Sequence, residues 1–194
     1  MSYRPDFLII GMERSGTHWA AALLDNHPDI ACFPTLPFHN ESGEKRIGEV
    51  HFFNTLASVE GKNEEKFTRP FSDFSTKYNK VFADLVQFEN RVPRDELYRM
   101  FRARFSEYCD QQRGTKKIVG EATAAYVFHL DFIDFLYPEI KKLCILRDPK
   151  DKIVSWHFNM LRKSKKEEAN LTREFALDYL EKRIIKEYEA LLAY

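Results

Sequence analysis

A segment near the amino terminus limits the possible folds of this chain more than any other feature. Residues 7–10 form a continuous apolar run, which is typical of a buried strand in a parallel sheet. A loop bounded by Gly11 and Gly16 follows, and a helical pattern then runs from Thr17 until Pro28 ends it. The apolar residues of that helix are Trp19, Ala20, Leu23 and Leu24. A strand, a glycine-bounded loop and a helix in this order predict an α/β domain.

The rest of the chain continues the alternation of strands and helices. Apolar residues at three- and four-residue steps predict a helix over 95–112, with Gly114 at its carboxyl end. Prolines and glycines scattered over residues 31–92 predict loops with short elements between them. Residues 49–53 are expected to form a short strand or the start of a helix. The further elements expected are a brief strand at 117–120, a helix at 129–137, a buried strand at 143–146, a helix capped by Asp148 with Pro149 at its first position, and an amphipathic helix over 173–194. We therefore expect one α/β domain over residues 1–194, a parallel β-sheet flanked by helices.

The composition of the chain excludes several classes of protein. With 194 residues, of which 44% are hydrophobic and 31% charged, the chain is long enough to bury a core and is neither a disordered nor a membrane-spanning sequence. Thirty basic residues balance thirty acidic ones, which argues against a nucleic-acid-binding protein. The three cysteines form no CxxC pair and no Cys/His cluster, so we expect reduced thiols in a cytoplasmic protein, without a disulfide framework or zinc site.

The loop at residues 11–18 has the composition of an anion site. Its glycines have the spacing of the G-x-x-x-x-G-K-[ST] phosphate loop, and it lies between a strand and a helix, as that motif requires. Thr17 stands at the position of the Lys, His18 stands where a hydroxyl would bind Mg²⁺, and Arg14 lies inside the loop. Backbone N–H groups and the helix dipole attract an anion there. The pattern predicts an anion of lower charge than a triphosphate, bound without metal; the alternative is an ordinary turn.

A second anion site is expected after the strand at 143–146. Arg147 ends this strand and Ser155 lies two turns into the next helix, so the guanidinium and the hydroxyl can meet around one anion. Ligands of open parallel sheets bind beyond the carboxyl ends of the strands, so Gly11 and Arg147 are expected to face one crevice. A ligand with two separated anionic groups would bridge the sites. The alternatives are a surface salt bridge with a solvated serine, and a magnesium-binding strand that ends in Asp148.

These two segments together resemble the sulfotransferase family. Residues 14–19 (RSGTHW) are similar to the family's loop for the 5′-phosphosulfate, and residues 147–155 (RDPKDKIVS) are similar to its 3′-phosphate motif, including the spacing from Arg to Ser. The resemblance implies a P-loop NTPase-like sulfotransferase fold. It also implies 3′-phosphoadenosine 5′-phosphosulfate (PAPS) as the sulfuryl donor, with no metal. The two phosphate sites of this donor match the two-anion ligand expected above.

The resemblance also implies a role for each matching residue. Arg14 would stabilise the bridging oxygen as the sulfuryl group leaves. Trp19 would stack on the adenine, and the alternative is a tryptophan that faces the core. Glu13, next to Arg14, is expected to be a solvated loop residue. The remaining donor-binding residues are Ser15, Gly16, Thr17 and His18 at the 5′ phosphate, and Arg147 and Ser155 at the 3′ phosphate.

A further likeness implies the general base. Residues 49–53 (EVHFF) are similar to the Glu-x-x-Phe-Phe stretch of the heparan-type and related bacterial sulfotransferases, in which the Glu takes the proton from the acceptor. Glu49 would then be the base, with His51 as its substitute; Gly48 stands where those enzymes carry a Lys. A carboxylate can serve if burial raises its pKa toward neutrality. Residues 120–126 (GEATAAY) also resemble the Gly-Glu-x-[Thr/Ser]-Pro-x-Tyr segment of these enzymes, without the Pro.

We therefore expect a PAPS-dependent sulfotransferase. It would transfer a sulfuryl group to a hydroxyl or amine of a carbohydrate or small-molecule acceptor and release 3′-phosphoadenosine 5′-phosphate (PAP). Neither nucleic acid nor a membrane is an expected partner, and the sequence indicates no oligomeric state. The alternatives are a P-loop kinase with an atypical loop and a non-catalytic PAP- or PAPS-binding module. The last helix has no stop signal before Tyr194, and family members continue with another strand and a basic closing segment, so we expect a C-terminally truncated chain.

Overall fold

A four-stranded parallel sheet with the strand order β2-β5-β1-β6 forms the centre of the molecule. The structure, a computed structural model, describes residues 4–33, 36–39, 45–48, 52–60, 94–164 and 172–194. The strands of the sheet are β1 (Phe7–Gly11), β2 (Ile30–Phe33), β5 (Ile118–Ala122) and β6 (Lys141–Ile145). A separate antiparallel pair consists of β3 (Leu36–His39) and β4 (Lys45–Gly48). The expected α/β class with a parallel sheet is confirmed.

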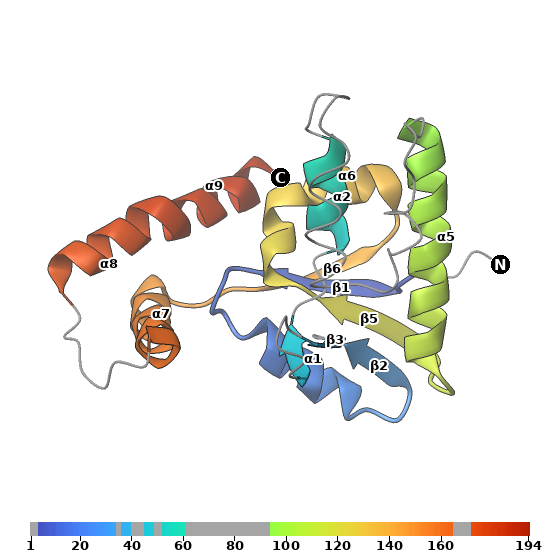
Figure 1. The fold of residues 1–194 in the computed structure, drawn as a ribbon, viewed down its shortest axis with the longest axis horizontal. Coiled ribbons are helices and arrows are strands. Elements are labelled where there is room, and N and C mark those ends of the chain that lie inside the picture. The colour runs from blue at the N-terminus through green and yellow to red at the C-terminus, as the bar shows by residue number, and fades with distance from the viewer. Residues whose placement is uncertain (1–3, 34–35, 40–44, 49–51, 61–93, 165–171) are drawn as a thin grey trace.

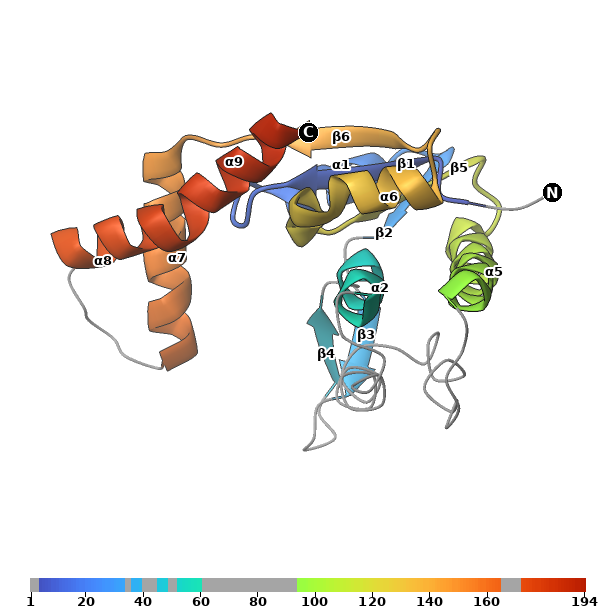
Figure 2. The same ribbon diagram turned by 90° about the horizontal axis from the view of Figure 1, so that it is seen from above.

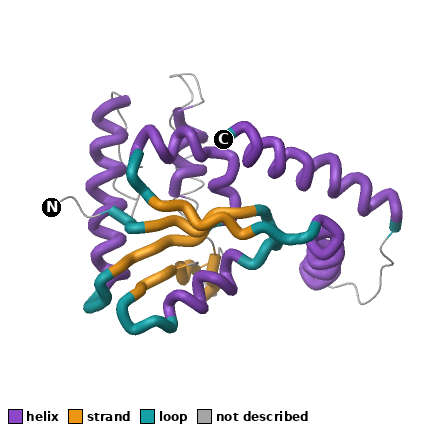
Figure 3. Tube along the Cα trace, turned by 180° about the vertical axis from the view of Figure 1, so that it is seen from behind, coloured by secondary structure: helices purple, strands orange, loops and turns teal. Residues whose placement is uncertain are grey.

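Helices lie on both faces of this sheet (Figure 1). On one face is α1 (Thr17–Asp25), and on the other are α2 (Phe52–Glu60), α5 (Arg94–Arg113) and α6 (Leu130–Leu136). The 3₁₀ helix η3 (Ala124–His129) leads from β5 into α6. The carboxyl-terminal helices are α7 (Pro149–Ser164), α8 (Arg173–Tyr179), the π-helical turn η4 (Leu180–Ile184) and α9 (Ile185–Ala193). Figures 2 and 3 show these last helices beside the edge at which β1 and β6 end.

The larger hydrophobic core lies between the sheet and the helices α2, α5 and α6. Aromatic side chains fill it, because Phe53 lies at ring-centroid distances of 5.5 Å from Phe101, 5.3 Å from Phe105 and 5.0 Å from Tyr126. All four of these side chains are fully buried. Edge-to-face and tilted contacts of this kind add to the stabilisation that comes from burial. The core therefore fixes α2 and η3 relative to the sheet.

The strand expected at 143–146 is an edge strand and not a buried one. Among the residues that the structure describes, β6 pairs only with β1, and Leu143 and Leu146 are 45% and 60% exposed. The helix α1 packs mainly on β1, β2 and β5, and Ile145 is the residue of β6 that reaches the core beneath this helix. The apolar run correctly predicted a strand, but it carried no information about the position of that strand in the sheet.

The buried face of α1 consists of small side chains. Ala20 and Ala21 pack on the sheet in a second, smaller core, and Leu24 lies at the edge of that core. Trp19 and Leu23 are mostly exposed. Small side chains let the helix approach the sheet closely, so the two alanines occupy the contact. The apolar residues that predicted this helix are therefore not all part of its buried face.

The other expected elements are present with shifted boundaries. The helix expected over 95–112 is α5, and Gly114 follows it with a φ of 56°. At the start of α7 the Lys150 N–H donates to Asp148 Oδ1 at 2.7 Å, which confirms the predicted cap. The helix expected at 129–137 begins earlier, in η3, and the last helix is continuous through the π-helical turn η4. Within the described part of the chain, no helix is both long and apolar enough to cross a bilayer.

Candidate functional site

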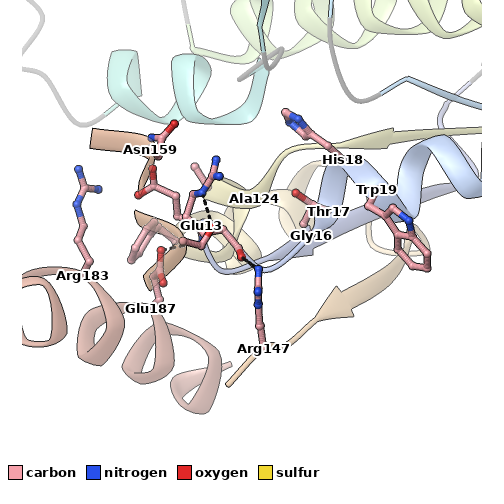
Figure 4. A pocket seen from close by; sticks show the side chains of 14 residues that line it. Glu13, Gly16, Thr17, His18, Trp19, Ala124, Arg147, Asn159, Arg183 and Glu187 are labelled. Atoms are coloured by element: carbon pink, nitrogen blue, oxygen red, sulfur yellow. Dashed lines mark hydrogen bonds between the residues drawn. The ribbon is translucent and has the colours of Figure 1, made fainter. Parts of the chain in front are cut away.

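A cavity of about 730 Å³ lies beyond the carboxyl ends of β1 and β6 (Figure 4). The two strands pair in parallel with Gly11 opposite Ile145, so the segments that follow them leave the sheet side by side. The approach is so close that a Cβ atom on Gly11 would lie 2.6 Å from the Ile145 carbonyl oxygen. Such a volume is typical of small-molecule sites, which measure about 300–1,000 Å³. The predicted donor residues that line the cavity are Arg14, Gly16, Thr17, His18, Trp19, Arg147 and Ser155.

The loop after β1 is a tight turn that its own hydrogen bonds hold. Both the N–H and the Oγ–H of Ser15 donate to the carbonyl oxygen of Met12, at 3.1 and 2.6 Å. The φ angle is 104° at Gly16, where a side chain would be strained, and 65° at Arg14. The hydroxyl of Ser15 therefore serves the turn, while the loop ends on the first turn of α1 at Thr17. The start of an α-helix presents backbone N–H groups and the positive end of the helix dipole, which attract an anion.

The two predicted anion sites are in direct contact. Arg14 Nε donates to Ser155 Oγ at 3.2 Å, and Arg147 Nη1 donates to the carbonyl oxygen of Arg14 at 3.2 Å. Arg147 Nε also lies 3.8 Å from Asp151 Oδ2, in a partly exposed pair that is worth little in water. Two guanidinium groups and one hydroxyl, from segments 133 to 141 residues apart, thus meet at one end of the cavity.

Trp19 and His18 are exposed at the cavity, whereas Glu13 is not placed as expected. Trp19 is 71% exposed and lines the cavity, so the alternative of a core-facing tryptophan is wrong. His18 is exposed on the same turn of α1. Glu13 is partly buried and not simply solvated, and its backbone N–H donates to Glu187 Oε1 at 3.0 Å.

A buried ion pair next to the loop was not predicted from the sequence. Lys152 of α7 donates to Glu187 Oε2 of α9, and the two residues are 0% and 2% exposed. Burial lowers the pKa of Lys152, and the bond to the Glu187 carboxylate opposes this shift. The available signal was the spacing of Glu187, which follows Ile184 by three residues and precedes Leu191 by four, and so lies on the apolar face of its helix. Arg183 and Asn159, which also line the cavity, had no such signal.

The segment at 120–126 forms one wall of the site and holds the start of α2. Thr123 Oγ1 donates to the buried Glu121 carboxylate at 2.5 Å, and the Phe52 N–H donates to Tyr126 Oη at 3.1 Å. Burial raises the pKa of Tyr126, with a smaller contribution from Glu121, so the phenol stays neutral. Ala124 and Ala125 of the same segment line the cavity. The amino end of α2 is therefore attached to the wall of the cavity.

The predicted base residues are not placed. Glu49 and His51 lie outside the described residues, between β4 and α2. The part of the chain that the structure does describe contains no group of three or more His, Cys, Asp or Glu side chains that could hold a metal ion.

The fold and the site together define an α/β protein in which arginine side chains and a glycine-bounded loop lie together at the carboxyl ends of two adjacent parallel strands. Comparison with protein families gives the particular family: the model described as "Sulfotransferase family" matches residues 5–193, so the chain belongs to the sulfotransferase family. The resemblance found in the sequence is thereby confirmed at the level of the family. The likeness of residues 49–53 to the heparan-type enzymes stays a prediction.

The solved structures that match the chain include the crystal structure of sulfotransferase STF9 from Mycobacterium avium, with 15% sequence identity and a TM-score of 0.40. The match covers 84% of this chain and 47% of that protein, so the chain spans about half of its length. No curated protein matches the chain.

Proposed function

We propose that this chain is a PAPS-dependent sulfotransferase that transfers a sulfuryl group to a hydroxyl or amine and releases PAP. Membership of the sulfotransferase family supports the reaction class. The observation that carries the proposal for the donor is the contact between the two motifs, in which Arg14 bonds to Ser155 and Arg147 bonds to the Arg14 carbonyl. A donor with two separated phosphates needs both motifs at one cavity.

The loop would hold the 5′ end of the donor. The N–H groups of the first turn of α1 and the guanidinium of Arg14 would bind the phosphosulfate, with Gly16, Thr17 and His18 along the loop. Arg14 would then neutralise the charge that develops on the bridging oxygen, which is the task that a metal ion performs in phosphoryl transfer. Positioning of the acceptor in line with the sulfur would supply the rest of the acceleration.

The second motif would hold the 3′ phosphate. Arg147 and Ser155 line the same cavity from the end of β6 and from α7. A guanidinium and a hydroxyl can both donate to one phosphate. Trp19, exposed at the cavity, is free to stack on the adenine.

The general base in this proposal is Glu49, with His51 as the alternative. Phe52 is bonded to Tyr126, and Asn54 Nδ2 donates to the carbonyl oxygen of Ala125 at 3.4 Å, so α2 begins at the wall of the cavity. Glu49 precedes Phe52 by three residues, a separation that an extended chain spans in about 10 Å. This short tether supports a base that reaches the acceptor. The acceptor we propose is a carbohydrate or another small molecule.

Calorimetric titration tests the donor half of this proposal. PAP, titrated in the presence of a chelator, is expected to bind at least about tenfold more tightly than ATP with Mg²⁺, because the loop lacks the Lys and the hydroxyl that a triphosphate and its metal need. Binding of ATP that depends on Mg²⁺ and exceeds that of PAP would identify a kinase instead. PAP binding without transfer from labelled PAPS to any class of hydroxyl or amine acceptor would favour the non-catalytic module.

A further inference from the structure

The last helix contacts the anion-binding loop through one buried carboxylate. Glu187 of α9 is 2% exposed, and its Oε1 accepts the N–H of Glu13 at 3.0 Å across 174 residues of sequence. Its other oxygen accepts from Lys152, which is 0% exposed on α7. Figure 4 shows Glu187 and Glu13 side by side at the cavity, joined by this hydrogen bond. One carboxylate therefore ties α9 to α7 and to the loop at once.

The bonded N–H lies in the turn that carries Arg14. Glu13 directly precedes Arg14, whose φ of 65° is uncommon for a residue other than glycine and persists only when its surroundings hold it. The N–H of Glu13 belongs to the same peptide unit as the carbonyl oxygen of Met12, which accepts from both the N–H and the hydroxyl of Ser15. Holding this peptide therefore holds the turn that carries Arg14. The side chain of Arg14 bonds to Ser155, three residues beyond Lys152 on α7. The ion pair and the Arg14–Ser155 contact thus connect the same helix to the same loop.

Stability alone gives no reason for an ion pair at this place. Two buried charges lose their hydration, and well-packed apolar side chains of similar size are often as stabilising or more so. A carboxylate, however, offers two directional acceptors. One oxygen is used by Lys152, which keeps the group oriented, and the other is used by the loop.

We propose that Glu187 is a positioning residue that holds the anion-binding loop in its ligand-ready conformation through the amide of Glu13, and that Lys152 orients Glu187 for this task. The inference rests on the proposed function only in that the loop binds the 5′ end of the donor. It predicts that the acceptor oxygen at position 187, and not the ion pair as such, sustains donor binding.

Two double variants separate the oxygen from the charge. Lys152→Met with Glu187→Gln removes both charges but keeps an amide oxygen that can accept from Glu13. Lys152→Met with Glu187→Leu removes both charges and the acceptor, with similar side-chain volume. Each avoids a lone buried charge, which would confound the result with unfolding. An exposed ion pair on the same continuous helix joins Asp178 and Lys182, so Asp178→Asn serves as the matched control for removal of an ion pair.

Titration with PAP and amide hydrogen exchange are the two measurements. In the variant with Lys152→Met and Glu187→Gln, PAP affinity is expected within about threefold of the parent chain. In the variant with Lys152→Met and Glu187→Leu, it is expected to fall about tenfold to hundredfold, the cost of leaving a buried donor without its partner. In the absence of ligand, the Glu13 amide is expected to exchange faster in the double variant with Glu187→Leu than in the parent chain or in the double variant with Glu187→Gln. Asp178→Asn is expected to change neither.

The outcomes distinguish this inference from the proposed function. Equal PAP affinity and equal Glu13 exchange in the two double variants would overturn the positioning role of Glu187. Loss of PAP binding in both double variants, with intact thermal unfolding, would also overturn it, because charge and not the acceptor would then matter. If the parent chain does not bind PAP at all, the proposed donor is wrong, and the exchange of the Glu13 amide still decides the role of Glu187.

Discussion

Replacing Arg14 with alanine is expected to lower kcat for sulfuryl transfer by about 10²- to 10³-fold, the usual effect of removing one group that stabilises developing charge. Arg14 lines the cavity and bonds to Ser155, so its guanidinium lies at the junction of the two motifs. PAP affinity is expected to change by only about tenfold, because the backbone N–H groups of the loop remain. The measurements are kcat at saturating PAPS and the Kd of PAP.

Alanine is the right replacement at this position because the backbone φ of 65° is strained for any residue with a Cβ atom. The substitution therefore removes the guanidinium without changing the backbone strain. Arg104→Ala, which removes an exposed arginine paired with Glu107, is the control and should leave kcat unchanged. A loss in PAP affinity as large as the loss in kcat would contradict the account, because Arg14 would then bind ground state and transition state equally.

Replacing Glu49 with glutamine is expected to lower kcat by about 10²- to 10⁴-fold, the range that general base catalysis contributes. Glutamine has the shape of glutamate but cannot take a proton from the acceptor. PAP affinity is expected to stay within about twofold, since a general base would act on the acceptor and not on the donor phosphates. Transfer from labelled PAPS and titration with PAP are the measurements.

His51→Asn is the matched variant for the alternative base. If Glu49 is the base, this variant should keep most of its activity. If His51→Asn loses transfer while Glu49→Gln retains it, His51 is the base. The likeness of residues 49–53 to the heparan-type segment would then have led to the wrong residue for the base. Normal kcat in both variants would show that the base lies elsewhere.

The sequence predicted the part of the fold that positions the site. Strand β1, the glycine-bounded loop and α1 follow from an apolar run, two glycines and a helical pattern, each of which is a local signal. The cap of α7 at Asp148 is equally local. The adjacency of Gly11 and Arg147 followed from a rule on parallel sheets, and the pairing of β1 with β6 gives it a structural basis.

Features that depend on contacts distant in sequence could not be predicted. The exposure of Leu143 depends on which helix covers which strand, and no residue of the strand encodes this. The bond from Glu13 to Glu187 spans 174 residues and required the last helix to be placed in space. A charged residue on an apolar helix face marked Glu187 as unusual, but only the structure identified its partners.

The most direct test of the central claim compares three nucleotides that differ only in their phosphates: PAP, 5′-AMP and 3′-AMP. The Kd of each is measured by calorimetry in the presence of a chelator, for the parent chain and for Arg147→Ala. If the loop and the Arg147 motif bind one ligand together, PAP should bind about tenfold to hundredfold more tightly than either monophosphate, and Arg147→Ala should remove most of its advantage over 5′-AMP. Equal affinities for the three nucleotides, or an advantage of PAP that survives Arg147→Ala, would contradict the account.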